Sequence, residues 1–252
     1  MNTRIPIPKP LKALINNGAL LAVNHSGGKD SQAMTSLILD AGISRDQLVI
    51  VHADLGRVEW PGTFDHIKAT TFGLPIIVAE AKRDFFEMVK ARKMFPSPKY
   101  RQCTSDLKRG PIERELRRYL KANPRFQGQI INAMGMRADE SRDRAKRTPL
   151  TFSKRNSKAG RVWFDWLPIH ALTTRDVFEV ISNAGQVPHW AYGAGMSRVS
   201  CSFCIMSSRA DLCRAATLRP RLFEDYAALE HQLGHTLSPN REYLSDIVSC
   251  AG

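Results

Sequence analysis

The chain has 252 residues, of which 43% are apolar and 24% are charged. This apolar content excludes an intrinsically disordered protein, and the length excludes a peptide-sized disulfide scaffold. Lysine and arginine exceed aspartate and glutamate by 13, so the protein is strongly basic. No apolar run near the start approaches the roughly 20 residues of a membrane-spanning helix. We therefore expect a soluble cytoplasmic protein with no membrane partner.

Short runs rich in valine and isoleucine alternate with helix-length segments through the first three quarters of the chain. The pattern predicts strands at 18–24, 47–52, 74–79 and 129–134, and helices at 31–41, 62–72, 84–93, 108–122 and 174–184. This alternation favours an α/β fold, a Rossmann-like parallel sheet with helices on both faces. We expect this domain over residues 1–165, followed by a small, mainly helical C-terminal lobe over 166–252.

A glycine-rich turn follows the first predicted strand and leads into the first predicted helix. It reads Ser26-Gly27-Gly28-Lys29-Asp30-Ser31. Two glycines permit a sharp turn with exposed N–H groups, and the helix start and Lys29 add positive charge. The turn predicts a phosphate or pyrophosphate site; the alternative is a tight turn without a ligand. It is not a Walker A loop, because the GxxxxGK[ST] frame is absent.

Basic residues concentrate in one quarter of the chain. Residues 99–161 contain 18 lysines and arginines against six acidic residues, and 153–160 (SKRNSKAG) resemble a mobile basic loop. Such a field attracts polyanions, so nucleic acid is an expected partner. The alternative is a solvated basic face with a few arginines for a small anionic substrate.

The cysteines predict a metal centre. Cys201, Cys204 and Cys213 form a C-x2-C-x8-C pattern, and Cys103 lies about a hundred residues earlier. Four thiolates suit a [4Fe–4S] cluster or structural zinc, whereas His231 or His235 in place of Cys103 would favour zinc. Buried cysteines without a metal are the alternative, because a reducing compartment disfavours disulfides.

The turn SGGKDS resembles the pyrophosphate loop of the adenine nucleotide α-hydrolase (PP-loop ATP pyrophosphatase) superfamily. This resemblance implies that residues 26–31 hold the phosphates of ATP. It also implies adenylation with Mg²⁺, in which a nucleophilic oxygen attacks the α-phosphorus and pyrophosphate leaves. Asp54, just past the second predicted strand, is either a nucleotide contact or a turn aspartate.

Further blocks, in one order from residue 18 to about 213, resemble the phosphoadenylyl-sulfate (PAPS) reductase family. They are Cys103–Lys108 with Pro111, Gly135–Ser141 with Arg142 and Arg144, and Trp166–Ile169 with Thr174 and Asp176. The resemblance implies catalytic roles for Lys29, Asp30 and Arg137. It also implies nucleotide contacts from Gly135 and Arg142, with Arg144 a further candidate for the anion site.

Within this family, the cysteine set resembles that of the iron–sulfur subunits of DNA phosphorothioation. That likeness implies a [4Fe–4S] cluster on Cys103, Cys201, Cys204 and Cys213, and a cysteine desulfurase as the sulfur donor. The tail from Ser245 lacks the Glu-Cys-Gly-[Ile/Leu]-His signature of sulfonucleotide reductases. Cys250 is interpreted as incidental rather than as a mobile sulfur carrier.

These observations predict an ATP pyrophosphatase and sulfurtransferase that activates a nucleic-acid or nucleotide substrate and supports sulfur transfer. One alternative is a reductase that acts on phosphoadenylyl sulfate or adenylyl sulfate. The other is a non-catalytic nucleic-acid-binding protein that senses a nucleotide. No motif that reads nucleic acid accompanies the basic segment, so DNA, RNA and a small nucleotide all stay candidate substrates.

Overall fold

A computed structural model describes residues 4–249, which form two compact units that interleave along the sequence. Unit 1 comprises residues 4–52, 64–79 and 112–188, and unit 2 comprises residues 53–63, 80–111 and 189–249. The domain boundary expected near residue 165 stays a prediction.

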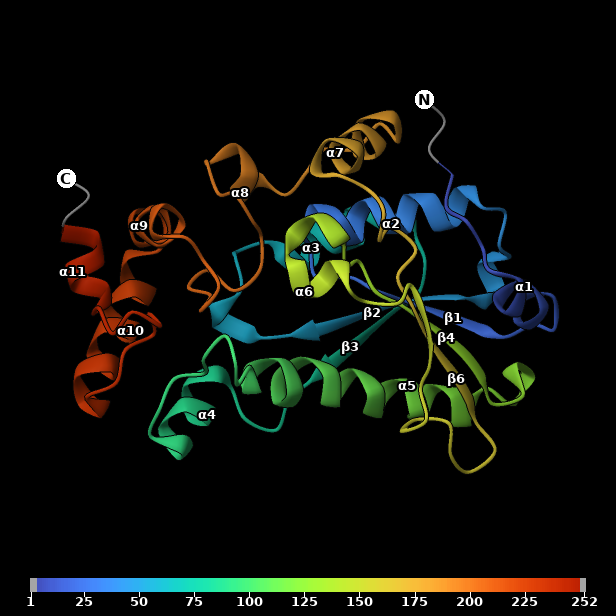
Figure 1. The fold of residues 1–252 in the computed structure, drawn as a ribbon, viewed down its shortest axis with the longest axis horizontal. Coiled ribbons are helices and arrows are strands. Elements are labelled where there is room, and N and C mark those ends of the chain that lie inside the picture. The colour runs from blue at the N-terminus through green and yellow to red at the C-terminus, as the bar shows by residue number, and fades with distance from the viewer. Residues whose placement is uncertain (1–3, 250–252) are drawn as a thin grey trace. The chain divides into compact units, whose positions relative to one another are not determined.

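Unit 1 is built around a six-stranded sheet in the order β3-β2-β1-β4-β6-β5 (Figure 1). The strands are β1 Leu20–Asn24, β2 Leu48–Asp54, β3 Ile76–Glu80, β4 Gln129–Ala133, β5 Leu150–Phe152 and β6 Val162–Trp166. β1 runs parallel to β2 and β4, and β4 runs parallel to β6. β5 runs antiparallel to β6, with Leu150 opposite Trp166. The predicted α/β sheet is confirmed, and β5 and β6 were missing from the prediction.

Helices cover both faces of this sheet. The helices of unit 1 are α1 Lys9–Asn16, α2 Lys29–Asp40, α3 Thr63–Thr70, α5 Gly110–Ala122, α6 Arg142–Ala145 and α7 Thr174–Asn183, with α3 and α5 starting in unit 2. Leu21 and Val23 of β1 belong to a core cluster with α1, α2, α3 and α7, whereas Leu20 and Ala22 pack with α5. Figure 1 shows α2 and α5 on opposite sides of the sheet. Because both faces are buried, β1 reads as a continuous apolar run.

Local sequence sets where the helices begin. Thr173 caps α7, since its Oγ1 accepts a hydrogen bond from the Asp176 N–H at 3.2 Å and the Asp176 carboxylate accepts one from the Thr173 N–H at 2.8 Å. Asp84 and Glu87 form the same reciprocal cap on α4, Phe85–Arg92. Short 3-10 turns occupy Arg45–Gln47, Gly56–Val58, Pro124–Phe126 and Ala138–Glu140.

The basic loop between β5 and β6 is tied down by Asn156, which is 2% exposed. Its Oδ1 accepts a hydrogen bond from Arg117 of α5 at 3.1 Å, and its Nδ2 donates to Ser153 Oγ at 3.3 Å. Arg155 also pairs with Glu113 of α5. These contacts hold the loop, predicted to be mobile, against helix α5.

Unit 2 is mainly helical. Besides α4 it contains α8 Trp190–Gly193, α9 Arg209–Leu218, α10 Pro220–Leu233 and α11 Leu244–Ser249, and a π-helical turn over Cys103–Arg109. Its core is a separate cluster in which aromatic side chains gather around Tyr226 of α10. Across residues 4–249, no helix is both long enough and apolar enough to cross a membrane.

Glu230 of α10 anchors the segment that leads into α11. Its side chain is fully buried, and its two carboxylate oxygens accept hydrogen bonds from the N–H groups of Leu237 at 2.6 Å and Leu244 at 2.8 Å. Burial raises the pKa of this carboxyl group. The two bonds join the chain on either side of residues 238–243 to α10.

We expect Glu230→Ala to lower the free energy of unfolding by about 2–5 kcal/mol, because two buried N–H groups lose their acceptor. Urea denaturation of the metal-free protein measures this change. Glu224→Ala, at an exposed position of the same helix, is the control and should change it by less than about 0.5 kcal/mol. Equal effects from the two variants would contradict the anchoring role of Glu230.

Candidate functional site

The glycine-rich turn lies between the end of β1 and the start of α2. Gly27 adopts a positive φ of 75°, a conformation that favours glycine. Ser31 closes the turn: its Oγ accepts a hydrogen bond from the Ser26 N–H at 3.2 Å and donates to the Gly28 carbonyl at 2.8 Å. The N-cap residue of α2 is Gly28, which supplies no side-chain acceptor to the first helical N–H groups. The positive end of the α2 dipole therefore has no capping side chain, as at helix starts that bind anions.

Lys29 and Asp30 occupy the first turn of α2. Lys29 is 7% exposed, and its ammonium lies 3.3 Å from the Asp30 carboxylate. A charged side chain held at the helix start adds to the positive field of the N–H groups. This part of unit 1 is therefore suited to a phosphate.

The loop after β4 packs against this turn. Arg137 is 2% exposed and donates to Asp30 Oδ1 at 2.6 Å, Asp139 Oδ2 at 2.9 Å and Thr174 Oγ1 at 3.0 Å. Gly135 approaches the helix so closely that an added Cβ would lie 3.2 Å from the backbone of Asp30 and Ser31. Arg137, predicted to be catalytic, is thus placed to position Asp30.

The other predicted nucleotide contacts are spread over both units. Arg142 is exposed at the first residue of α6, and Arg144 pairs with Glu140. Asp54 is the last residue of β2, and its Oδ1 accepts a hydrogen bond from the Gly56 N–H at 2.7 Å, as in a turn. Asp54 belongs to unit 2, whereas Arg142 belongs to unit 1.

His25, the first residue of the turn after β1, is buried. The sequence motifs predicted no role for this residue. Its Nδ1 accepts a hydrogen bond from the Gly27 N–H at 3.1 Å, so the neutral ring carries its proton on Nε2. Burial, followed by the nearby His66 and His52, lowers the pKa of His25 to about 3. The imidazole therefore shapes the phosphate turn as a neutral acceptor.

We expect the phosphate turn to lose stability in acid. The pKa of His25 is near 3 in the folded state and about 6.5 in the unfolded state, so the unfolded chain binds the proton first. The contribution of His25 to the free energy of unfolding is then full above pH 6.5 and declines as the pH falls towards 3. Denaturation of the metal-free protein between pH 7.5 and 5 measures this slope.

The matched variant is His25→Asn, which keeps an acceptor for Gly27 but has no titrating ring. Its denaturation curve should depend less on pH than that of the wild type over the same range. An unchanged slope would show that His25 does not carry the acid sensitivity.

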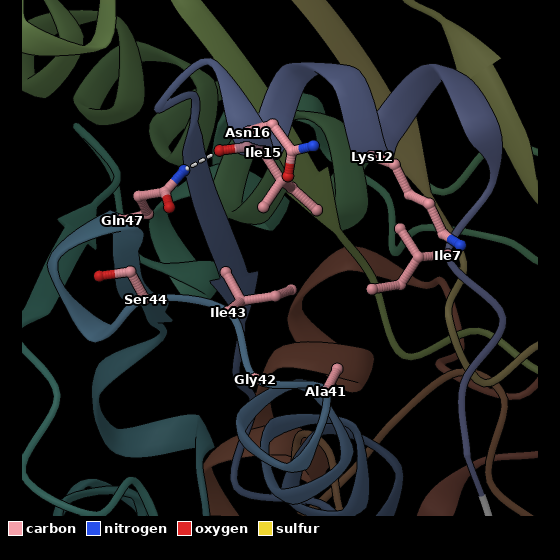
Figure 2. A pocket seen from close by; sticks show the side chains of 9 residues that line it. All are labelled: Ile7, Lys12, Ile15, Asn16, Ala41, Gly42, Ile43, Ser44 and Gln47. Atoms are coloured by element: carbon pink, nitrogen blue, oxygen red, sulfur yellow. Dashed lines mark hydrogen bonds between the residues drawn. The ribbon is translucent and has the colours of Figure 1, made fainter.

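A surface cavity of unit 1 lies at the other end of β1 from this turn, and Figure 2 shows its lining residues. It has a volume of about 390 Å³ and is lined by α1 and by the segment from Ala41 to Gln47 that precedes β2. Gln47 Nε2 donates to the Ile15 carbonyl at 2.8 Å at its edge. This position is at the amino ends of β1 and β2, whereas the phosphate turn follows the carboxyl end of β1.

The predicted cysteine ligands all belong to unit 2. Cys103 begins the π-helical turn, and Cys201 pairs with Glu59 in an isolated antiparallel bridge. The segment from Cys201 to Cys204 is held by Arg219, which donates to the Glu59 carbonyl at 2.6 Å and to Ser202 Oγ at 3.1 Å.

A lysine accompanies these thiols. The Cys201 thiol is the main cause that raises the pKa of the Lys108 ammonium, with further contributions from Cys204 and Cys103. Burial raises the pKa of Cys201 to about 11 and also raises the pKa of Cys103, whereas Lys108 opposes both shifts. Lys108 therefore supplies a positive charge beside thiols that are costly to ionise.

Cys213 packs against the same unit 2 core as the other three cysteines. Its thiol donates to the Ile247 carbonyl at 3.4 Å, and its role as a ligand stays a prediction. The two histidines considered as zinc ligands stack on aromatic rings: His231 on Tyr243 and His235 on Phe95. Cys250 lies outside the described residues.

A cavity of about 350 Å³ opens beside Cys204 within unit 2. Its wall is partly apolar, with Ile205, Leu212 and Ile247, and partly polar, with Arg209, which pairs with Glu242 at 2.8 Å. The cavity gives a small molecule or an extended segment of a partner access to the Cys204 side of the thiol group.

The residues around the cysteines can be compared with what a bound metal centre requires. The donors are thiols, which bind iron–sulfur clusters and zinc. Tyr226 Oη and Trp60 Nε1 are buried and have no hydrogen-bond partner in the part of the chain that the structure describes. Buried phenol and indole groups are normally paired. The residues present therefore fit an anionic sulfur-containing centre.

The fold and the turn define an α/β protein of the kind that binds nucleotide phosphates after the first strand. The chain belongs to the phosphoadenosine phosphosulfate reductase family, because residues 20–207 match that domain. No curated protein sequence matches it.

Several solved structures resemble the chain at low identity. PAPS reductase from Candida auris in its phosphate complex is 11% identical, with a TM-score of 0.47 over 79% of this chain and 98% of that one. FMN adenylyltransferase from Candida glabrata is 12% identical, with a TM-score of 0.47 over 76% and 55%. The U34-tRNA thiolase NcsA from Methanococcus maripaludis, with its [4Fe–4S] cluster, is 13% identical, with a TM-score of 0.40 over 88% and 76%. The chain spans less than two thirds of the adenylyltransferase structures.

Proposed function

We propose that the protein is an ATP pyrophosphatase of this family that activates an oxygen of a nucleic acid or nucleotide for replacement by sulfur. One observation carries the proposal. A single chain combines a helix start without a capping side chain, which carries Lys29 at a glycine turn, and partly buried cysteines whose charges act on Lys108. The first feature suits ATP phosphates, and the second suits a sulfur-handling centre.

In the proposed activation step, the substrate oxygen attacks the α-phosphorus of ATP and pyrophosphate leaves. The N–H groups of α2 and the Lys29 ammonium bind the phosphate oxygens, where negative charge grows during the attack. Arg137 holds Asp30, and so the helix start, in place. Gly135 and Arg142 are further proposed contacts in unit 1, and Asp54 is proposed at the end of β2. Mg²⁺ would neutralise charge on the leaving pyrophosphate.

In the proposed second step, sulfur displaces AMP from the activated position. Cys103, Cys201 and Cys204 would hold a [4Fe–4S] cluster, with Cys213 as the proposed fourth ligand. Such a cluster supplies a site for sulfur or for electrons. Lys108 stabilises the negative charge that the thiolates gain. A cysteine desulfurase would deliver sulfur as a persulfide, and an external thiol would supply the two electrons needed to release it as sulfide.

We expect the anaerobically prepared protein to contain iron and sulfide and to release pyrophosphate from ATP with its substrate. Lys29→Ala should reduce pyrophosphate release at least a hundredfold, because the phosphates lose their buried ammonium. Lys12→Ala, on exposed α1, is the control and should leave it unchanged. Cys201→Ser should lose iron and still bind ATP.

Two outcomes would contradict parts of this proposal. A colourless protein with stoichiometric zinc would remove the cluster. Sulfite release from phosphoadenylyl sulfate with a thiol donor, but no pyrophosphate from ATP, would favour sulfonucleotide reduction, the reaction for which the matching family is named.

A nucleic-acid substrate predicts salt-dependent binding. Arg118 on α5 and Arg155 on the β5–β6 loop are more than half exposed and carry the positive charge of unit 1 to solvent. If six such residues contact phosphates, the log–log slope of affinity against salt should be about −5 on duplex and about −4 on single strands. Filter binding at several salt concentrations measures it.

The matched variants for this measurement remove three positive charges each. Lys154, Arg155 and Lys158 changed to alanine should reduce the size of the slope by about 2 to 3. The same change at Lys9, Lys12 and Arg45 should leave it unaltered. A flat response of the wild type would contradict nucleic-acid binding.

A further inference from the structure

Tyr226 of α10 is a fully enclosed polar side chain of the unit 2 core. Its residue is 0% exposed, and its ring packs against Phe86 at 4.8 Å and Phe203 at 5.1 Å between ring centroids. Phe85 and Phe95 complete the aromatic enclosure at 5.5 and 6.2 Å. A phenylalanine would satisfy this apolar packing equally well. The hydroxyl therefore needs a reason of its own.

Within residues 4–249, the Tyr226 hydroxyl has no hydrogen-bond partner. A buried hydroxyl left in this way costs about 1–3 kcal/mol relative to a satisfied one. Native interiors tolerate few such groups, and a bound group that the protein chain itself does not supply is one explanation for them. The Tyr226 hydroxyl is therefore available to a bound acceptor.

The surroundings of the hydroxyl identify the kind of acceptor. Burial raises the pKa of Tyr226, and the next causes are the nearby Cys201, Cys204 and Cys103 thiols. Phe203, against which the ring packs, lies between Cys201 and Cys204 in the chain. The phenol thus belongs to the core against which Cys201 and Cys204 pack, and a sulfur bound there is the acceptor that these surroundings favour.

We propose that Tyr226 donates a hydrogen bond to an anionic sulfur of the iron–sulfur centre, and so sets the reduction potential of that centre. This inference rests on the cluster of the proposed function. A donor to sulfur withdraws negative charge and favours the reduced, more negative state of the centre. Tyr226 is a positioning residue, because it acts through the centre and touches neither ATP nor the substrate oxygen.

The test compares anaerobically prepared wild type, Tyr226→Phe and the control Tyr243→Phe. Tyr243 is partly buried in the same unit and stacks on His231, away from the aromatic enclosure. Iron and sulfide content and a redox titration followed by absorbance and EPR are measured on each. Tyr226→Phe should keep its iron, whereas the ratio of reduced to oxidised centre at a fixed solution potential should fall about tenfold. For a one-electron couple this is a shift of about 59 mV to more negative potential.

A second measurement distinguishes this role from a structural one. Without the centre, the hydroxyl has no acceptor to lose, so metal-free Tyr226→Phe should be at least as stable to urea as the metal-free wild type. With the centre bound, the wild type should be the more stable of the two. If the variant does not retain iron, substitution of all tyrosines by 3-fluorotyrosine strengthens the donor and should move the wild-type potential in the positive direction.

The outcomes separate the two proposals. Wild-type protein without iron would overturn the cluster of the proposed function and this inference with it. Iron-loaded Tyr226→Phe with an unchanged potential would overturn this inference alone. A loss of stability in the metal-free variant would show that the hydroxyl bonds to protein and would also overturn it.

Discussion

The buried ion pair between Arg137 and Asp30 is the contact on which the phosphate turn depends. It joins the loop after β4 to the first turn of α2 at 2.6 Å, where the strand order of the sheet reverses between β1 and β4. Parallel strands leave their helix N-termini and loops at the same edge, and nucleotides bind at such a reversal. Gly135 permits the close approach, and His25 fixes the turn from the other side as a neutral acceptor.

In unit 2, the corresponding constraint is the cost of ionising the cysteine thiols. Thiols in an apolar core ionise only when something stabilises the charge, which is why burial raises the pKa of Cys201 and Cys103. Lys108 provides a full positive charge, and Tyr226 provides a buried donor in the core of the same unit. The proposed anionic centre would satisfy both groups.

Much of the fold was predictable because its signals are local. The runs around β1, β2, β3 and β4 are apolar and rich in β-branched residues, and the helices between them have clear periods. The strand β6 was missed because Val162–Trp166 (VWFDW) is short, contains a charged residue and has a single valine, and its pairing with β4 is visible only in the sheet. The π-helical turn over Cys103–Arg109 was missed because helical periodicity begins only at Lys108, so the sequence predicted the helix from that residue.

The sequence by itself determined the family, the α/β class, the phosphate turn and the candidate ligands, since these depend on residue types at fixed short spacings. The tertiary structure decided which distant groups meet. It placed the predicted cysteine ligands in one unit, paired Arg137 with Asp30, and enclosed the Tyr226 hydroxyl among aromatic rings without a partner in the described residues. Such meetings follow from how helices and loops pack, and packing depends on the whole core rather than on any short stretch of sequence.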